Sequence, residues 1–190
     1  MAETKGSFRT DSGAGLLWDA AAFSGVNDYD SWSEQLEEEA DIQRHLEAGH
    51  IVPLNILQDM TAGFVVRTGR AGGRVRKAVD AGLTERERKY LVTSSGQPYL
   101  FVSTGRAYVS GLEHVSGSVK NGERFLTPVD IPASRWACMV YLIDWEAEPG
   151  MVVNDRPHPD ALPDFVVTVN PAASGRTYRT DFESFDPTPE

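Results

Sequence analysis

Three carboxylates at alternate positions, Asp144, Glu146 and Glu148, form the pattern in this sequence that is best suited to chemistry. They follow an apolar run, so an extended chain would place them on one side, about 7 Å apart. Carboxylates that converge from a rigid element can hold a hard cation such as Ca²⁺ or Mg²⁺, or can act as a general acid and base. Asp160, in the proline-rich segment that follows, can complete such a site. The alternative is a solvated strand end that keeps a sheet edge polar.

No established catalytic or cofactor motif accompanies these carboxylates, and we expect no cofactor. The four histidines lack metalloprotease spacing, because two residues five apart on a helix do not share a face. Neither G-x-S-x-G nor a nucleotide-binding glycine motif occurs. The single cysteine, Cys138, lies in the apolar run and is predicted to be a packing residue. The remaining enzymatic hypothesis is a small metal-dependent hydrolase, or a sugar- or phosphate-processing enzyme, that uses the carboxylates.

The apolar run before the carboxylates, residues 135–143, predicts the central strand of a sheet. Trp136, Cys138 and Val140 alternate with a second set of apolar side chains. A strand with two apolar faces is covered on both sides. We therefore predict that Trp136 and Val140 belong to the core.

Two segments carry the signals of helices. In each, a hydroxyl residue is followed three positions later by a glutamate, which is the pattern of a capping box. The two pairs are Ser31 with Glu34 and Thr84 with Glu87. Apolar residues at helical spacing and a stop at Gly49 extend the first helix over about 31–47, and the second is short, about 84–91.

Charge is distributed unevenly along the chain. Residues 28–47 hold eight acids against one base, whereas residues 67–89 hold eight bases against three acids. Two solvated faces that partly neutralise each other would explain this segregation. Contact with a protein partner explains it as well, because exposed charges steer association. The residues we assign to a partner surface are Glu37, Glu38, Asp41, Arg70, Arg74 and Arg76.

The other segments predict mainly β structure. Strands are expected at the N-terminus on either side of a glycine turn, over 51–57 and 63–67 around a turn at 58–62, and repeatedly after residue 98, with a hairpin turn at 103–105. Successive strands without intervening helices favour antiparallel pairing. We predict an α+β fold, an antiparallel sheet or sandwich with two helices, in one domain over residues 1–190. The tail from about 184 to 190 is expected to be flexible.

Composition limits the partner and the compartment. The net charge of −10 repels phosphate backbones, so we expect no nucleic acid. No apolar run is long enough to cross a membrane and the N-terminus lacks the pattern of a secretion signal, so we expect a cytoplasmic protein without a membrane partner. The sequence leaves the oligomeric state open.

Several motifs together resemble an uncharacterised, immunity-protein-like family of bacterial domains of about this size. They are T-D-S-G before a strand, D-Y-D-S-W at a helix entry, L-T-x-x-E-R, the stretch I-P-A-S-R-W-A-C-M-V-Y-L-I-D-W-E-A-E-P-G, and L-P-D-F-V-V. Small acidic bacterial proteins of this kind often act as immunity proteins for neighbouring toxin genes. The resemblance thus implies a non-catalytic protein that neutralises a cognate toxin through a charged interface, and it assigns no catalytic residues.

Overall fold

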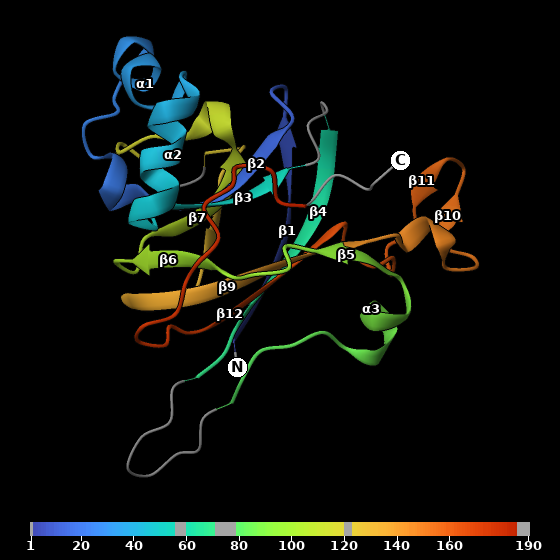
Figure 1. The fold of residues 1–190 in the computed structure, drawn as a ribbon. Coiled ribbons are helices and arrows are strands. Elements are labelled where there is room, and N and C mark those ends of the chain that lie inside the picture. The colour runs from blue at the N-terminus through green and yellow to red at the C-terminus, as the bar shows by residue number, and fades with distance from the viewer. Residues whose placement is uncertain (1, 56–59, 71–78, 120–122, 186–190) are drawn as a thin grey trace.

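Two β-sheets form the body of the protein, and helices lie beside them (Figure 1). The computed structural model describes residues 2–55, 60–70, 79–119 and 123–185. The first sheet has the order β1 (Ala2–Thr10), β4 (Met60–Thr68), β12 (Phe165–Pro171), β9 (Ser134–Ile143), β5 (Leu91–Ser94), and β6 (Tyr99–Ser103) also pairs with β9. The second has the order β3 (Ile51–Asn55), β2 (Ala14–Asp19), β7 (Ala107–Gly111), β8 (Thr127–Val129). These pairings are antiparallel except β12 with β4, which confirms the α+β prediction.

Strand β9 is central, as its two apolar faces predicted. It pairs with β12 along one edge and with β5 and β6 along the other. Trp136, Cys138 and Val140 are buried and belong to the core cluster. Burial raises the pKa of the Cys138 thiol, so this thiol stays protonated, as suits a packing residue.

The two sheets enclose a common hydrophobic cluster. Phe64 and Phe165 reach it from the first sheet, and Leu16 and Trp18 reach it from the second. The Trp18 indole lies edge-on to the Phe23 ring, with centroids 5.9 Å apart. Aromatic packing of this kind adds to the stabilisation from hydrophobic burial.

The acidic segment forms two helices, α1 (Tyr29–Leu36) and α2 (Glu39–Ala48), so the prediction of one helix over 31–47 was wrong. At about 100° per residue, an uninterrupted helix would place Ile42 about 240° from Leu36. Both side chains are buried, and a break at the extended Glu38 allows both to reach the core. Gly49 ends α2 in a left-handed conformation with φ 76°, as predicted.

The helix caps agree with the sequence in one case of two. Asp28 caps α1 and Ser31 occupies the third helical position, so the box predicted for Ser31 with Glu34 was wrong. Thr84 and Glu87 form the predicted capping box of α3 (Glu85–Lys89), which is shorter than the 84–91 expected. Aspartate caps at least as well as serine, and D-Y-D-S also satisfies the spacing.

Three predictions for turns and ends need correction. Residues 60–62 belong to β4, and the remainder of the predicted 58–62 turn lies outside the described residues. Residues 103–105 form no hairpin, because β6 and β7 belong to different sheets and the chain crosses between them there. Ser184, at the start of the predicted flexible tail, is buried: its hydroxyl donates to the Pro53 carbonyl and its amide to Asn55 Oδ1. Residues 186–190 lie outside the description.

The proline-rich segment after β9 carries a two-residue turn. Strands β10 (Val152–Val153) and β11 (Arg156–Pro157) pair around Asn154 and Asp155, whose φ angles are 52° and 57°. Positive φ at both positions is typical of the turns that close short hairpins. This hairpin and α3 lie on the side of the molecule away from α1 and α2 (Figure 1). In the described part of the chain, no helix is long and apolar enough to cross a membrane.

Candidate functional site

The predicted carboxylate site does not form as expected, because the strand ends at Ile143. Asp144 caps a 3₁₀ helix, η3 (Trp145–Ala147), by accepting a hydrogen bond from the Ala147 amide at 3.1 Å. The alternation that would align the three carboxylates requires an extended chain and is lost in a helix. The prediction of a carboxylate row was therefore wrong.

Glu148 and Asp160, two of the four residues of the predicted metal site, both contact Arg86. Glu148 is bonded to the Arg86 guanidinium at 2.7 to 3.0 Å, and that hydrogen bond lowers the pKa of Glu148. The same Arg86 donates to the Asp160 carbonyl at 2.8 Å and so ties this segment to α3. Within the described ranges, no three His, Cys, Asp or Glu side chains are grouped so that they could hold a metal ion.

The residues predicted for a partner surface are separated in the fold. Glu37 and Glu38 are exposed at the junction of α1 and α2, and Asp41 is half-buried and paired with Arg44. Arg70 lies beyond β4, where its backbone bridges to Val79. Arg74 and Arg76 lie outside the described residues. Figure 1 places the segment that follows β4 and carries Arg70 far from the two helices, so Arg70 does not share a site with the acidic candidates.

A cavity of about 470 Å³ lies between the start of α1 and the segment that follows β7. We call it the α1 pocket and define it by Val26, Asn27, Asp28, Tyr29, Trp32, Glu113, His114, Val115 and Ser116. Val26 and Val115 are each only 2% exposed and form an apolar base. Aromatic rings and carboxylates of the same set surround this base, which is the composition expected of a small binding site.

The aromatic wall of the α1 pocket is partly fixed and partly exposed. The Trp32 indole donates to the Leu112 carbonyl at 3.2 Å, which joins α1 to the 3₁₀ helix η2 (Leu112–His114). Tyr29 stacks on Trp32 with centroids 6.2 Å apart, and Tyr29 remains 71% exposed. On the other side, His114 stacks on Phe125 at 4.7 Å. An exposed aromatic ring beside a fixed one is typical of a contact residue.

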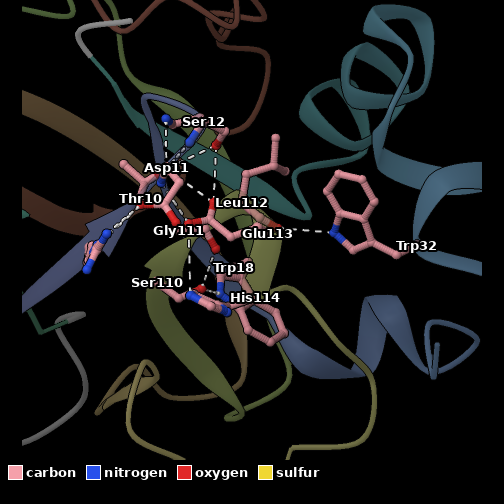
Figure 2. A network of polar contacts seen from close by, with 12 residues as sticks. Thr10, Asp11, Ser12, Trp18, Trp32, Ser110, Gly111, Leu112, Glu113 and His114 are labelled. Atoms are coloured by element: carbon pink, nitrogen blue, oxygen red, sulfur yellow. Dashed lines mark hydrogen bonds and ion pairs between the residues drawn. The ribbon is translucent and has the colours of Figure 1, made fainter. Parts of the chain in front are cut away.

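Figure 2 shows the network that holds Glu113 at the pocket. Its carboxylate accepts hydrogen bonds from the Thr10 hydroxyl, the Asp11 amide and the Ser12 hydroxyl, at 3.0 to 3.1 Å. These donors lie in the T-D-S-G turn, over 100 residues away along the chain. Asp28, the second carboxylate of the pocket, accepts from the Ser31 amide and hydroxyl, and these hydrogen bonds lower its pKa. Both acids are thus oriented before any ligand arrives.

Sequence motifs pointed to only some of the residues of the α1 pocket. D-Y-D-S-W supplies Asp28, Tyr29 and Trp32 at a helix entry. Glu113 and His114 come from a segment 80 residues later with no motif of its own, and only the fold brings them to α1. Fixed anionic groups beside aromatic faces favour a cationic ligand, since a cation is attracted to both.

A second cavity, about 980 Å³, lies over the outer face of β1 and β4. Its wall includes the buried ion pair of Arg67 with Glu87 and the segment from Pro157 to Asp164. Asp164 holds this segment in place by accepting from the Gly63 amide at 2.6 Å and from the Trp145 indole at 2.9 Å. These charged side chains already bind other groups of the protein. The cavity therefore has fewer groups that could bind a ligand than the α1 pocket has.

Two histidines meet at the end of α2 with their Nδ1 atoms 3.0 Å apart. Burial lowers the pKa of both, and that of His45 reaches about 4, with further contributions from His50 and Arg44. Asp41 and Asp19 oppose the change in His45 and in His50 respectively, without reversing it. Both imidazoles are therefore neutral in the folded protein near pH 7.

We expect this pair to make the protein less stable as the pH falls. An unfolded histidine takes up a proton near pH 6.5, whereas folded His45 does so near pH 4. The free energy of unfolding should therefore be highest above about pH 6.5 and fall by roughly 1 to 3 kcal/mol towards pH 4. Urea titrations across this range measure the change. The double variant His45→Gln, His50→Gln should flatten it. An unchanged slope in the double variant would contradict the assignment.

Two packed sheets with short helices beside them define an α+β fold, and one comparison with known proteins found a similar fold. No family model and no curated protein matches the chain. A solved structure described as "Crocagin biosynthetic gene J" is similar, with a TM-score of 0.57 and 14% sequence identity. The match covers 91% of this chain and 100% of that one. At this identity, the likeness concerns the fold alone.

Proposed function

We propose that this protein acts by binding a basic protein partner through an acidic surface formed by α1, α2 and the adjoining α1 pocket. The observation that carries the proposal is the 71% exposed Tyr29, stacked on Trp32 at the edge of a pocket with two oriented carboxylates. Aromatic residues such as tyrosine are enriched among the residues that contribute most to protein–protein binding. The acidic side chains of α1 and α2 add a negative electrostatic field, which attracts a basic partner.

The acidic residues of this surface are mostly left to solvent. Asp28, Asp30, Glu34, Glu37, Glu38, Glu39 and Glu47 are all exposed. Among the residues that the structure describes, the salt bridge between Asp41 and Arg44 is the one ion pair on these helices. Like charges at such spacing repel one another and lower the stability of an isolated helix. A basic partner would relieve that repulsion and would be drawn in by the same field.

The most concrete form of this proposal is an immunity protein that blocks a cognate toxin in the cytoplasm. The resemblance of the sequence motifs to an immunity-protein-like family supports it. The simple physical requirements of such a mechanism support it as well. Neutralising a toxin requires a rigid scaffold and a complementary surface, and needs no reaction. Charge steering then raises the association rate, so that the partner is captured quickly.

We expect the triple variant Glu37→Gln, Glu38→Gln, Asp41→Asn to bind the partner more slowly. Removing three charges weakens the steering field, so the association rate constant at low salt should fall by about tenfold, while dissociation changes little. The partner is obtained by affinity capture with the full chain from its native host. Association is then measured by stopped flow at several salt concentrations.

A matched variant separates the acidic surface from net charge. Glu146→Gln, Asp155→Asn, Asp160→Asn removes three carboxylates near the β10–β11 hairpin, on the other side of the molecule (Figure 1). It should retain nearly the parent association rate and the parent's dependence on salt. Equal rates for the parent and both variants, or no captured protein with basic contact residues, would count against the proposal.

A further inference from the structure

We infer that the α1 pocket receives an arginine side chain of the partner protein, an inference that rests on the proposed function and specifies its central contact. The pocket combines an apolar base, an exposed aromatic face and two carboxylates within about 470 Å³. That volume lies in the lower part of the range of small-molecule sites, about 300 to 1,000 Å³. It is large enough to admit a long side chain.

The aromatic wall favours a planar cation. A guanidinium can lie flat against Tyr29 or Trp32 and gains both stacking and attraction to the ring face. The hydrogen bond from Trp32 Nε1 to the Leu112 carbonyl occupies the polar edge of the indole, and Tyr29, which stacks on Trp32, is the more exposed ring of the wall. A lysine ammonium is a compact, strongly hydrated charge and would gain less from such a wall.

The carboxylates supply the charge and the direction. Asp28 and Glu113 both line the pocket, and each already accepts hydrogen bonds that fix its orientation. An arginine presents five N–H donors in a rigid fork, so that it can bond to a carboxylate while its plane rests on a ring. Because these groups are held beforehand, little conformational freedom is lost on binding.

A small probe tests this pocket without the partner protein. The full chain is titrated with N-acetyl-arginine methylamide, and the indole N–H signal of Trp32 is followed by NMR, with assignment from Trp32→Phe. We expect a saturable shift with a dissociation constant in the millimolar range, as suits so small a ligand. The citrulline analogue has the same shape without the charge and should bind at least tenfold more weakly. The lysine analogue should fall between the two.

Two variants locate the binding. Asp28→Asn preserves the helix cap, since asparagine caps as well as aspartate, and removes only the charge. It should weaken the arginine probe by about five- to tenfold, and Tyr29→Ala should do the same. Glu39→Gln makes an equal change in charge at an exposed position of α2 outside the pocket and should bind as the parent does. Circular dichroism of each variant checks that the protein is folded.

The outcomes distinguish the pocket from the wider surface. Equal binding of the arginine and citrulline probes, or a loss as large in Glu39→Gln as in Asp28→Asn, would overturn the arginine assignment. Neither result involves the partner, so the association rates of the acidic triple variant would still decide the proposed function. Conversely, selective probe binding with unchanged association rates would retain the cation pocket and reject the acidic surface as the means of partner capture.

Discussion

Replacing Arg67 by methionine is expected to lower the free energy of unfolding by about 3 to 5 kcal/mol, because it strands a buried carboxylate. The side chains of Arg67 and Glu87 are 6% and 3% exposed. Two parallel hydrogen bonds of 2.7 Å join them, and Arg67 Nε also donates to Glu3 at 2.6 Å. Without the guanidinium, Glu87 must either remain charged in a poorly solvated place or take up a proton.

Companion variants separate the ion pair from packing. In Arg67→Met, Glu87→Leu both charges are absent, so much of the lost stability should return. Glu87→Gln keeps a group that can accept from the Thr84 amide, as the native carboxylate does at 2.7 Å, and isolates the loss of charge. Urea titrations at pH 7 of the parent, Arg67→Met, Glu87→Leu and the double variant give the double-mutant cycle. A change below about 1 kcal/mol in Arg67→Met would show that this pair is not a buried support of the fold.

The contacts of Arg67 with Glu87 and Glu3 also make the free energy of unfolding depend on pH in the acid range. Burial alone would raise the pKa of Glu87, but hydrogen bonds from Arg67 and Thr84 lower it overall, and Arg67 lowers the pKa of Glu3. A carboxyl whose folded pKa is depressed contributes stability that is complete above its unfolded value and lost as the pH falls through the folded value. The ordinary value for glutamate is 4.5. This loss therefore begins at the acid end of the pH range in which His45 and His50 act, and it continues to lower pH.

The sequence predicted the elements whose signals are local. The two apolar faces of residues 135–143 identified the central strand, and Thr84 with Glu87 identified the start of α3. Gly49 was a reliable stop because few other residues adopt a positive φ without strain. In each case one short segment contained the whole physical cause.

The errors arose where a distant contact decides the local structure. Asp144 leaves the strand where its carboxylate caps η3, while its amide bonds to the Tyr90 carbonyl, and neither contact follows from alternation alone. Glu113 is a pocket residue because the T-D-S-G turn lies against it, over 100 residues away. Glu87 was identified as a cap, but its larger role, the bond to Arg67, depends on β4 packing against α3.

The removal of Trp136 tests the central strand directly. Trp136 is 5% exposed, and its indole donates to the Pro132 carbonyl at 2.9 Å. Phe101 of β6 and Pro171 of β12 lie across from it in register, so the ring joins three strands. Replacing it by alanine leaves a cavity that a paired strand cannot close by shifting.

Trp136→Ala should therefore lower the free energy of unfolding by about 3 to 5 kcal/mol, a large share of the roughly 5 to 15 kcal/mol that holds a domain of this kind folded. Trp136→Phe keeps most of the apolar volume, loses the bond to Pro132 and should cost about 1 to 2 kcal/mol. Val92→Ala, at a side chain 58% exposed on the neighbouring β5, should change stability by less than about 0.5 kcal/mol. Urea titrations followed by far-ultraviolet circular dichroism measure all three. Should Trp136→Ala unfold at the same urea concentration as Val92→Ala, the packing of β9 between its neighbours would not be what stabilises the first sheet.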